Sequence, residues 1–136
     1  MITAHTLIAL GVALFFAGLM SGLVIPKLKI PRMGLTSHLE GTANGTFLIV
    51  VGLIWDRIHL GDFWLAVAFW TLVYGTWANW GATLLGGIWG TGRITPISSG
   101  GRTGGAVQEK IVTTMLVLVG LTDIIGVAIV FVGLLS

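Results

Sequence analysis

The chain has 136 residues, of which 55% are hydrophobic and only 9% are charged. Soluble domains carry about 25% charged residues, so too few charges remain here to cover a surface exposed to water. Cysteine is absent, which excludes disulfides, thiolate nucleophiles and zinc–thiolate sites. The composition therefore predicts an integral membrane protein, and the length predicts a single domain.

The first predicted helix covers residues 5–25. Residues 6–25 form an uncharged run of 20 residues, which is about the length that crosses the hydrocarbon core of a bilayer. No basic residue precedes this run and it is long for the core of a signal peptide, so we expect the helix to be retained. Pro26 would end it, because proline lacks the N–H donor.

The second uncharged run is too short to cross a membrane, since it has only 15 residues and about 20 are needed. A full span therefore has to include the polar residues just before it, which predicts a helix over residues 37–57. Thr36 or Ser37 would be its N-cap. This extension places the imidazole of His38 and the carboxylate of Glu40 at the membrane edge or just inside it.

The third and fourth helices are predicted over residues 62–86 and 110–135. The third should end where Gly86 and Gly87 favour a C-cap or a loop. Residues 111–135 of the fourth contain a single charged residue, Asp123. The expected fold is an all-α, four-helix transmembrane bundle that forms homo-oligomers.

The loops predict the orientation in the membrane. Residues 26–36 and residues 87–109, together with the adjoining Lys110, carry six of the seven Lys and Arg residues, and Arg57 lies alone in the second loop. The positive-inside rule places the first and third loops in the cytoplasm and both termini outside.

Two asparagines are predicted to share one depth in the membrane. At 1.5 Å per residue, Asn44 lies roughly 10 Å and Asn79 roughly 9 Å from the cytoplasmic side. Unpaired amides are costly in hydrocarbon, so both side chains should face a neighbour or a cavity. The spacing of His38, Gly41 and Asn44/Gly45 predicts that these residues line one helix face.

Asp123 is predicted near the middle of the membrane, roughly 18 Å deep. An acid at that depth is a functional-site hypothesis by default. The alternative is a structural role, with the acid protonated or hydrogen-bonded to Tyr74 or Thr122. The sequence leaves both interpretations open.

His38 has a functional and a structural interpretation as well. A neutral imidazole nitrogen could be the axial ligand of a haem iron, and Gly41 and Gly45 would allow the flat macrocycle close to the backbone. Alternatively, His38 is an interfacial or capping residue. The two glycines would then form a small-xxx-small helix contact, as would Gly18 and Gly22.

The sequence resembles two related groups of membrane isomerases. HTLIALGVALFFAGLMSGLVIPKLKIPRM and SHLEGTANGTFLIVVGLIW resemble the hydroxylaminobenzene mutases closely, and this similarity covers most of the chain. A thinner similarity to the styrene oxide isomerases rests on two motifs followed by a glycine-rich loop. These motifs are His38-x5-Asn44-Gly45 and Trp77-Ala78-Asn79-x-Gly81.

The resemblance implies a cofactor, an assembly and a set of site residues. His38 would ligate haem b between adjacent protomers of a trimer, with Trp77 beside the cofactor, and Asn44 would lie next to the substrate. The chain departs from the isomerases at two positions. The family tyrosine six residues after Trp77 falls on Thr83, and the family acid two residues before it falls on Gly75.

The implied activity is a redox-neutral rearrangement of an aryl hydroxylamine, such as hydroxylaminobenzene, to 2-aminophenol. Ferric haem would weaken the N–O bond as a Lewis acid. Asn44, Asn79 and Thr83 would hold the departing oxygen near the ortho carbon, and Asp123 is a further catalytic candidate. The expected partners are a small aromatic substrate and membrane lipid, and no nucleic acid is expected. The expected location is the bacterial inner membrane, and the expected process is nitroaromatic degradation.

Two other function classes fit the size of the chain. Small multidrug transporters depend on an acid in their first helix, which residues 6–25 lack, although Asp123 could substitute for it. Membrane cytochrome b carriers usually need two histidines for a low-spin haem, and only His38 lies suitably on the inner side.

Overall fold

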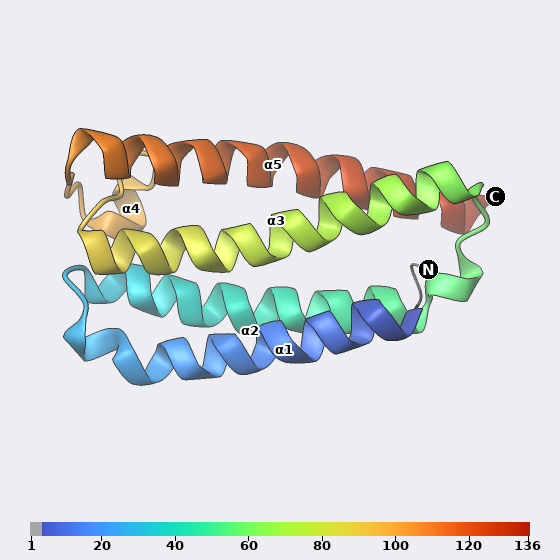
Figure 1. Ribbon diagram of the computed structural model, residues 1–136, viewed down its shortest axis with the longest axis horizontal. Helices are drawn as coiled ribbons and strands as arrows, with labels where there is room; N and C mark the ends of the chain where they lie inside the picture. The colour runs from blue at the N-terminus through green and yellow to red at the C-terminus, as the bar shows by residue number, and fades with distance from the viewer. Residues whose placement is uncertain (1–3) are drawn as a thin grey trace.

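The computed structural model describes residues 4–136, which form helices and connecting segments with no strand among them. The elements in chain order are α1 (Ala4–Val24), η1 (Ile25–Lys27), α2 (Pro31–Leu53), η2 (Trp55–Arg57), α3 (Asp62–Trp89), α4 (Pro96–Ser99) and α5 (Ala106–Leu135). Figure 1 shows the long helices α1, α2, α3 and α5 lying side by side, with the α1–α2 pair next to the α3–α5 pair. α1 packs on α2, α2 on α3, and α3 on α5.

The start of α2 differs from the sequence prediction. The helix begins at Pro31, six residues earlier than expected, and Ile30 is its N-cap. The predicted capping role of Thr36 and Ser37 is therefore wrong, because both residues lie inside the helix. Proline is well suited to the first helical position, since its φ is already helical and its missing N–H needs no partner there.

α2 also ends at Leu53, four residues before the predicted end at residue 57, because Trp55–Arg57 form the separate 3₁₀ helix η2. Two further ends extend the predicted helices. α3 continues through Gly86 and Gly87 to Trp89 and stops at Gly90, whose φ of 78° lies in the left-handed region. Gly86 stays helical because it provides space for a neighbour: an added Cβ would lie 2.6 Å from Met33 Cε on α2. α5 begins at Ala106, four residues before the predicted start.

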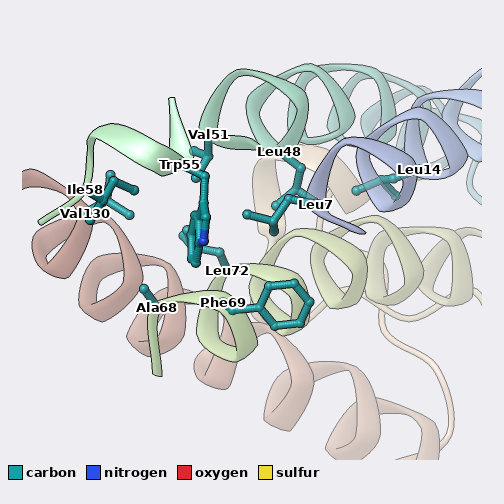
Figure 2. Packing of buried hydrophobic residues seen from close by; sticks show 10 residues of the cluster. All are labelled: Leu7, Leu14, Leu48, Val51, Trp55, Ile58, Ala68, Phe69, Leu72 and Val130. Carbon is teal, nitrogen blue, oxygen red and sulfur yellow. The ribbon is translucent and has the colours of Figure 1, made fainter. Parts of the chain in front are cut away.

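The hydrophobic core gathers around Trp55. Figure 2 shows its ring among side chains from all four long helices, including Leu7, Leu48, Leu72 and Val130. The Trp55 and Phe69 rings meet edge to face, with centroids 6.5 Å apart. The start of α1, the end of α5 and η2 lie at one end of the bundle, and the α1–α2 turn and α4 lie at the other (Figure 1). The apolar core thus occupies the terminal end.

Two segments are long and apolar enough to cross a membrane, Ala4–Lys27 and Ala106–Leu135. Their outer faces carry large apolar side chains, such as Leu23 at 71% and Ile124 at 72% exposure. Extended exposed apolar surface is rare in soluble monomers and typical of a surface that contacts lipid or protein. These helices and the family reported below indicate a membrane protein.

Candidate active site

Glu40 joins the two predicted asparagines. Asn44 lies one turn further along α2 and donates its side-chain Nδ2 to Glu40 Oε2 at 3.2 Å. Asn79 on α3 donates its Nδ2 to the same oxygen at 2.7 Å. All three side chains are half-buried. Two amide donors directed at one oxygen stabilise a carboxylate in a dry environment, because hydrogen bonds to an ionised group are stronger than neutral ones.

The cluster of Glu40, Asn44 and Asn79 lies well inside the bundle. At 1.5 Å per residue, Glu40 is about 14 Å along α2 from Pro31, and Asn79 is about 15 Å from Trp89 at the same end of the bundle. The sequence analysis predicted the two asparagines at this site but gave Glu40 no role there. The i, i+4 spacing of Glu40 and Asn44 was the signal that could have revealed the contact.

His38 is held by the first helix. Its Nδ1 lies 2.8 Å from the carbonyl oxygen of Gly18, and the ring packs against Gly22, where an added Cβ would lie 2.8 Å from Nδ1. A histidine that donates Nδ1–H to a backbone carbonyl presents Nε2 as the lone-pair nitrogen. That arrangement is common for histidines that bind metals.

Gly41 and Gly45 form the contact between α1 and α2. A Cβ on Gly41 would lie 3.0 Å from the backbone nitrogen of Gly18, and a Cβ on Gly45 would lie 2.8 Å from Cα of Phe15. Only glycine permits this backbone approach, so the small-xxx-small contact raised above is present. A role for these glycines beside a haem stays a prediction.

His38 and the Glu40 cluster lie on roughly opposite faces of α2. Residues 38 and 40 are two positions apart, which is about 200° around a helix with 3.6 residues per turn. His38 accordingly contacts α1, whereas Glu40 contacts α3. Asn44 belongs to the face of Glu40, so the expectation that His38, Gly41 and Asn44 line a single face is wrong. The prediction counted Asn44 and Gly45 as alternatives on that face, although consecutive residues are rotated by about 100° around the helix axis.

Comparison with known proteins places the chain in a family. The family model described as "Styrene oxide isomerase" matches residues 3–135. The chain belongs to the styrene oxide isomerase family. It is 46% identical to hydroxylaminobenzene mutase HabB of Ectopseudomonas oleovorans over 98% of this chain and 82% of that protein. It is also 43% identical to hydroxylaminobenzene mutase HabA of the same organism, over 81% of this chain and 82% of that protein.

The relatives are named as mutases and the family as an isomerase, so this chain is a membrane isomerase. No solved structure matches the chain. The resemblance drawn from the motifs on the second and third helices is therefore confirmed at the level of the family.

Two further predicted residues of this isomerase lie on α3. The indole rings of Trp77 and Trp80 meet edge to face, 5.9 Å apart, and the buried Nε1 of each has no hydrogen-bond partner among the described residues. Thr83 is buried, and its hydroxyl lies within hydrogen-bond distance of the Asn79 and Trp80 carbonyls of its own helix. Its proton is thereby engaged by the backbone. The predicted roles of Trp77 at the cofactor and of Thr83 at the substrate stay predictions.

Asp123 lies directly against Gly75. A Cβ added to Gly75 would overlap Asp123 Oδ1 and would lie 2.6 Å from its Cγ. The resemblance to the isomerases expects an acid at position 75, and here an acid from α5 occupies that space instead. Asp123 Oδ1 is buried and has no hydrogen-bond partner in the part of the chain described. The hydroxyl of Thr122, one of its expected partners, lies against carbonyls of its own helix.

Glu109 organises the loop before α5, a role that the sequence did not predict. Its buried carboxylate accepts hydrogen bonds from the backbone N–H groups of Gly92, Arg93 and Gly104 at 2.8–3.1 Å. Residues 4–136 contain no group of three or more His, Asp or Glu side chains that could hold a metal ion.

Proposed function

We propose that this isomerase rearranges an aryl hydroxylamine, such as hydroxylaminobenzene, to 2-aminophenol. The observation that carries the proposal is the cluster of Glu40, Asn44 and Asn79 at the α2–α3 contact. It occurs in a chain that is 46% identical to a hydroxylaminobenzene mutase over nearly its whole length. A small aromatic molecule that dissolves in the bilayer suits a site inside a membrane bundle.

The two asparagines would position the oxygen that migrates. A side-chain amide has two N–H donors and one carbonyl acceptor, and each asparagine uses one donor on Glu40. The remaining donor of Asn44 and of Asn79 can hold an oxygen atom close to the aromatic ring. Restricting that oxygen to the ortho carbon favours 2-aminophenol over the para product.

His38 fits the role of haem ligand better than any other histidine of the described chain. Its Nδ1 is anchored to Gly18 and its ring is fixed by Gly22, which leaves Nε2 for the iron. Haem b in its ferric state would supply a Lewis acid that weakens the N–O bond. The contribution of the chain is to orient the imidazole and to keep water away.

The opposite placement of His38 and Glu40 supports an assembly of several copies. The two side chains point away from each other across α2, which is about 10 Å thick, so one small substrate could not touch both within a single chain. We propose a homotrimer, as the resemblance to the isomerases implies.

The proposed topology has four spans in the bacterial inner membrane, with residues 26–36 and 87–109 in the cytoplasm. The absence of native cysteine allows a direct test with single cysteines and a thiol reagent that does not cross membranes. Ile97→Cys should react only from the cytoplasmic side and Gly61→Cys only from the outer side. The reverse pattern would refute the proposed orientation.

The decisive experiment is an absorption spectrum and a product assay on detergent-purified protein with hydroxylaminobenzene, which is also called phenylhydroxylamine. We expect a Soret band and conversion to 2-aminophenol, and we expect His38→Ala to lose both. Conversion without a Soret band would refute the haem but not the mutase activity. No conversion by a folded, haem-loaded protein would refute the mutase, and a bis-histidine spectrum would favour an electron carrier.

A further inference from the structure

Asp123 is half-buried, and its buried Oδ1 lacks the donors that Glu40 and Glu109 have. Glu40 accepts two side-chain N–H groups and Glu109 accepts three backbone N–H groups. Asp123 Oδ1 is enclosed against Gly75 and has no partner among residues 4–136. An ionised carboxylate in this state would be strongly unfavourable, because a buried charge needs compensating hydrogen bonds. A carboxyl group that retains its proton avoids this cost.

Asp123 and the cluster of Glu40, Asn44 and Asn79 lie along one face of α3. Gly75 and Asn79 are four residues apart and therefore lie on the same face, one turn from each other. Asp123 reaches this face from α5 at Gly75, and Glu40 reaches it from α2 at Asn79. Asp123 is therefore about one helical turn along α3 from the cluster proposed to hold the substrate oxygen.

A shallow, open apolar groove on the outer face of α5 borders Asp123. It is lined by Ile124, Val127, Ala128 and Phe131, and its volume is about 470 Å³. Small-molecule sites are mostly apolar concavities with a few polar groups that fix orientation. A benzene ring suits this groove, with its polar substituent directed at the carboxyl group.

We propose that Asp123 is the proton donor of the rearrangement, a role that rests on the function proposed above. Asp123 gives its proton to the hydroxylamine oxygen, the N–O bond breaks, and the oxygen leaves as water with the bonding pair. This leaves one positive charge on the nitrogen and the ring. The water oxygen then bonds to the ortho carbon, and the carboxylate of Asp123 accepts the proton that this oxygen releases.

The remaining proton movements complete the cycle. The ortho carbon loses its hydrogen as a proton and the nitrogen gains one, which restores the aromatic ring and gives 2-aminophenol. Asp123 has already regained its proton, so the carboxyl group is ready for the next substrate. Substrate and product have the same atoms and the same oxidation level, so no external oxidant or reductant is required.

Asp123→Asn tests the donor directly, because the amide keeps the shape of the side chain but cannot transfer an acid proton. We expect kcat for phenylhydroxylamine to fall about 100-fold or more, with KM nearly unchanged. The matched control is Asp56→Asn at the exposed far end, which should keep wild-type rates. A folded Asp123→Asn protein with a near wild-type rate would overturn the proposal. An inactive wild-type protein would instead overturn the mutase function itself.

A second variant moves the acid between helices. In Gly75→Asp combined with Asp123→Ala, the new carboxyl group enters the space that Asp123 vacates. We expect this pair to recover at least about 10-fold of the activity lost in Asp123→Ala alone, since proton transfer depends on the position of the acid and not on its helix. A paired variant that keeps its helical content and melting temperature but stays as slow as Asp123→Ala would overturn the proposal.

Discussion

The side-chain amide of Asn79 on α3 donates to Glu40 Oε2 on α2 across 2.7 Å, between helices whose outer faces are largely apolar. This bond and the bond from Asn44 enclose a carboxylate between two helices of the bundle. The geometry fixes how α2 is rotated against α3 at the depth of the proposed site.

Asn79→Leu should weaken both stability and activity. Loss of one donor leaves Glu40 less well satisfied, and an unsatisfied buried acceptor costs about 1–3 kcal/mol. We expect a lower melting temperature in detergent and a larger share of 4-aminophenol among the products, because the oxygen is held less firmly. Thr46→Ala, at an exposed position on α2, is the control. An unchanged product ratio in a folded Asn79→Leu protein would exclude the positioning role.

Gly22→Ala should disturb haem binding without changing the ligand. The added methyl group would lie 2.8 Å from His38 Nδ1 and 3.2 Å from its Cε1, so the imidazole has to rotate away from Gly18. We expect a weaker or shifted Soret band while His38 is still present. Gly61→Ala, where no described atom lies within 4 Å of the new Cβ, should leave the spectrum unchanged. A normal spectrum for Gly22→Ala would show that this contact does not set the ligand geometry.

The number of long helices and half of their ends, to within one residue, follow from the sequence because they depend on local features. Uncharged runs define α1, α3 and α5, and Pro26 lies at the end of the first helix as expected. The start of α2 was missed because Arg32 made that segment resemble a loop. Pro31 is favourable at the first helical position, and the helix begins there although Arg32 follows.

The site was only partly predictable, because it depends on how the helices are rotated against each other. The predicted depths in the membrane were enough to place Asn44 and Asn79 at the same level. Rotation decides that both contact Glu40, and that His38 faces α1 instead. The fit of Asp123 to Gly75 depends on two helices that are distant in sequence. No local pattern around either residue reveals it.

Glu109→Ala should loosen the loop between α3 and α5. The carboxylate is the shared acceptor of Gly92, Arg93 and Gly104 N–H groups, and each donor left without a partner costs about 1–3 kcal/mol where it is buried. We expect faster amide hydrogen exchange across residues 92–104 and little change within α3. Gln108→Ala, on an exposed neighbouring position, is the control. Equal exchange rates in both variants would show that the loop is held by other contacts.

Gly18→Ala and Gly120→Ala form a matched pair that separates helix packing from helix propensity. A Cβ on Gly18 would lie 2.6 Å from the Thr42 nitrogen and 2.7 Å from the Gly41 carbonyl carbon, so α1 and α2 have to move apart. A Cβ on Gly120 meets no described atom within 4 Å.

Alanine is the better helix former by roughly 0.5–1 kcal/mol, so Gly120→Ala should keep or raise the melting temperature. Gly18→Ala should lower it, because lost backbone contact outweighs that gain. Separation of α1 from α2 also removes the carbonyl that holds His38 Nδ1, so the Soret band should weaken in the same variant. Thermal unfolding and absorption spectra of the two proteins decide the matter. A Gly18→Ala protein as stable as Gly120→Ala would contradict the close α1–α2 contact.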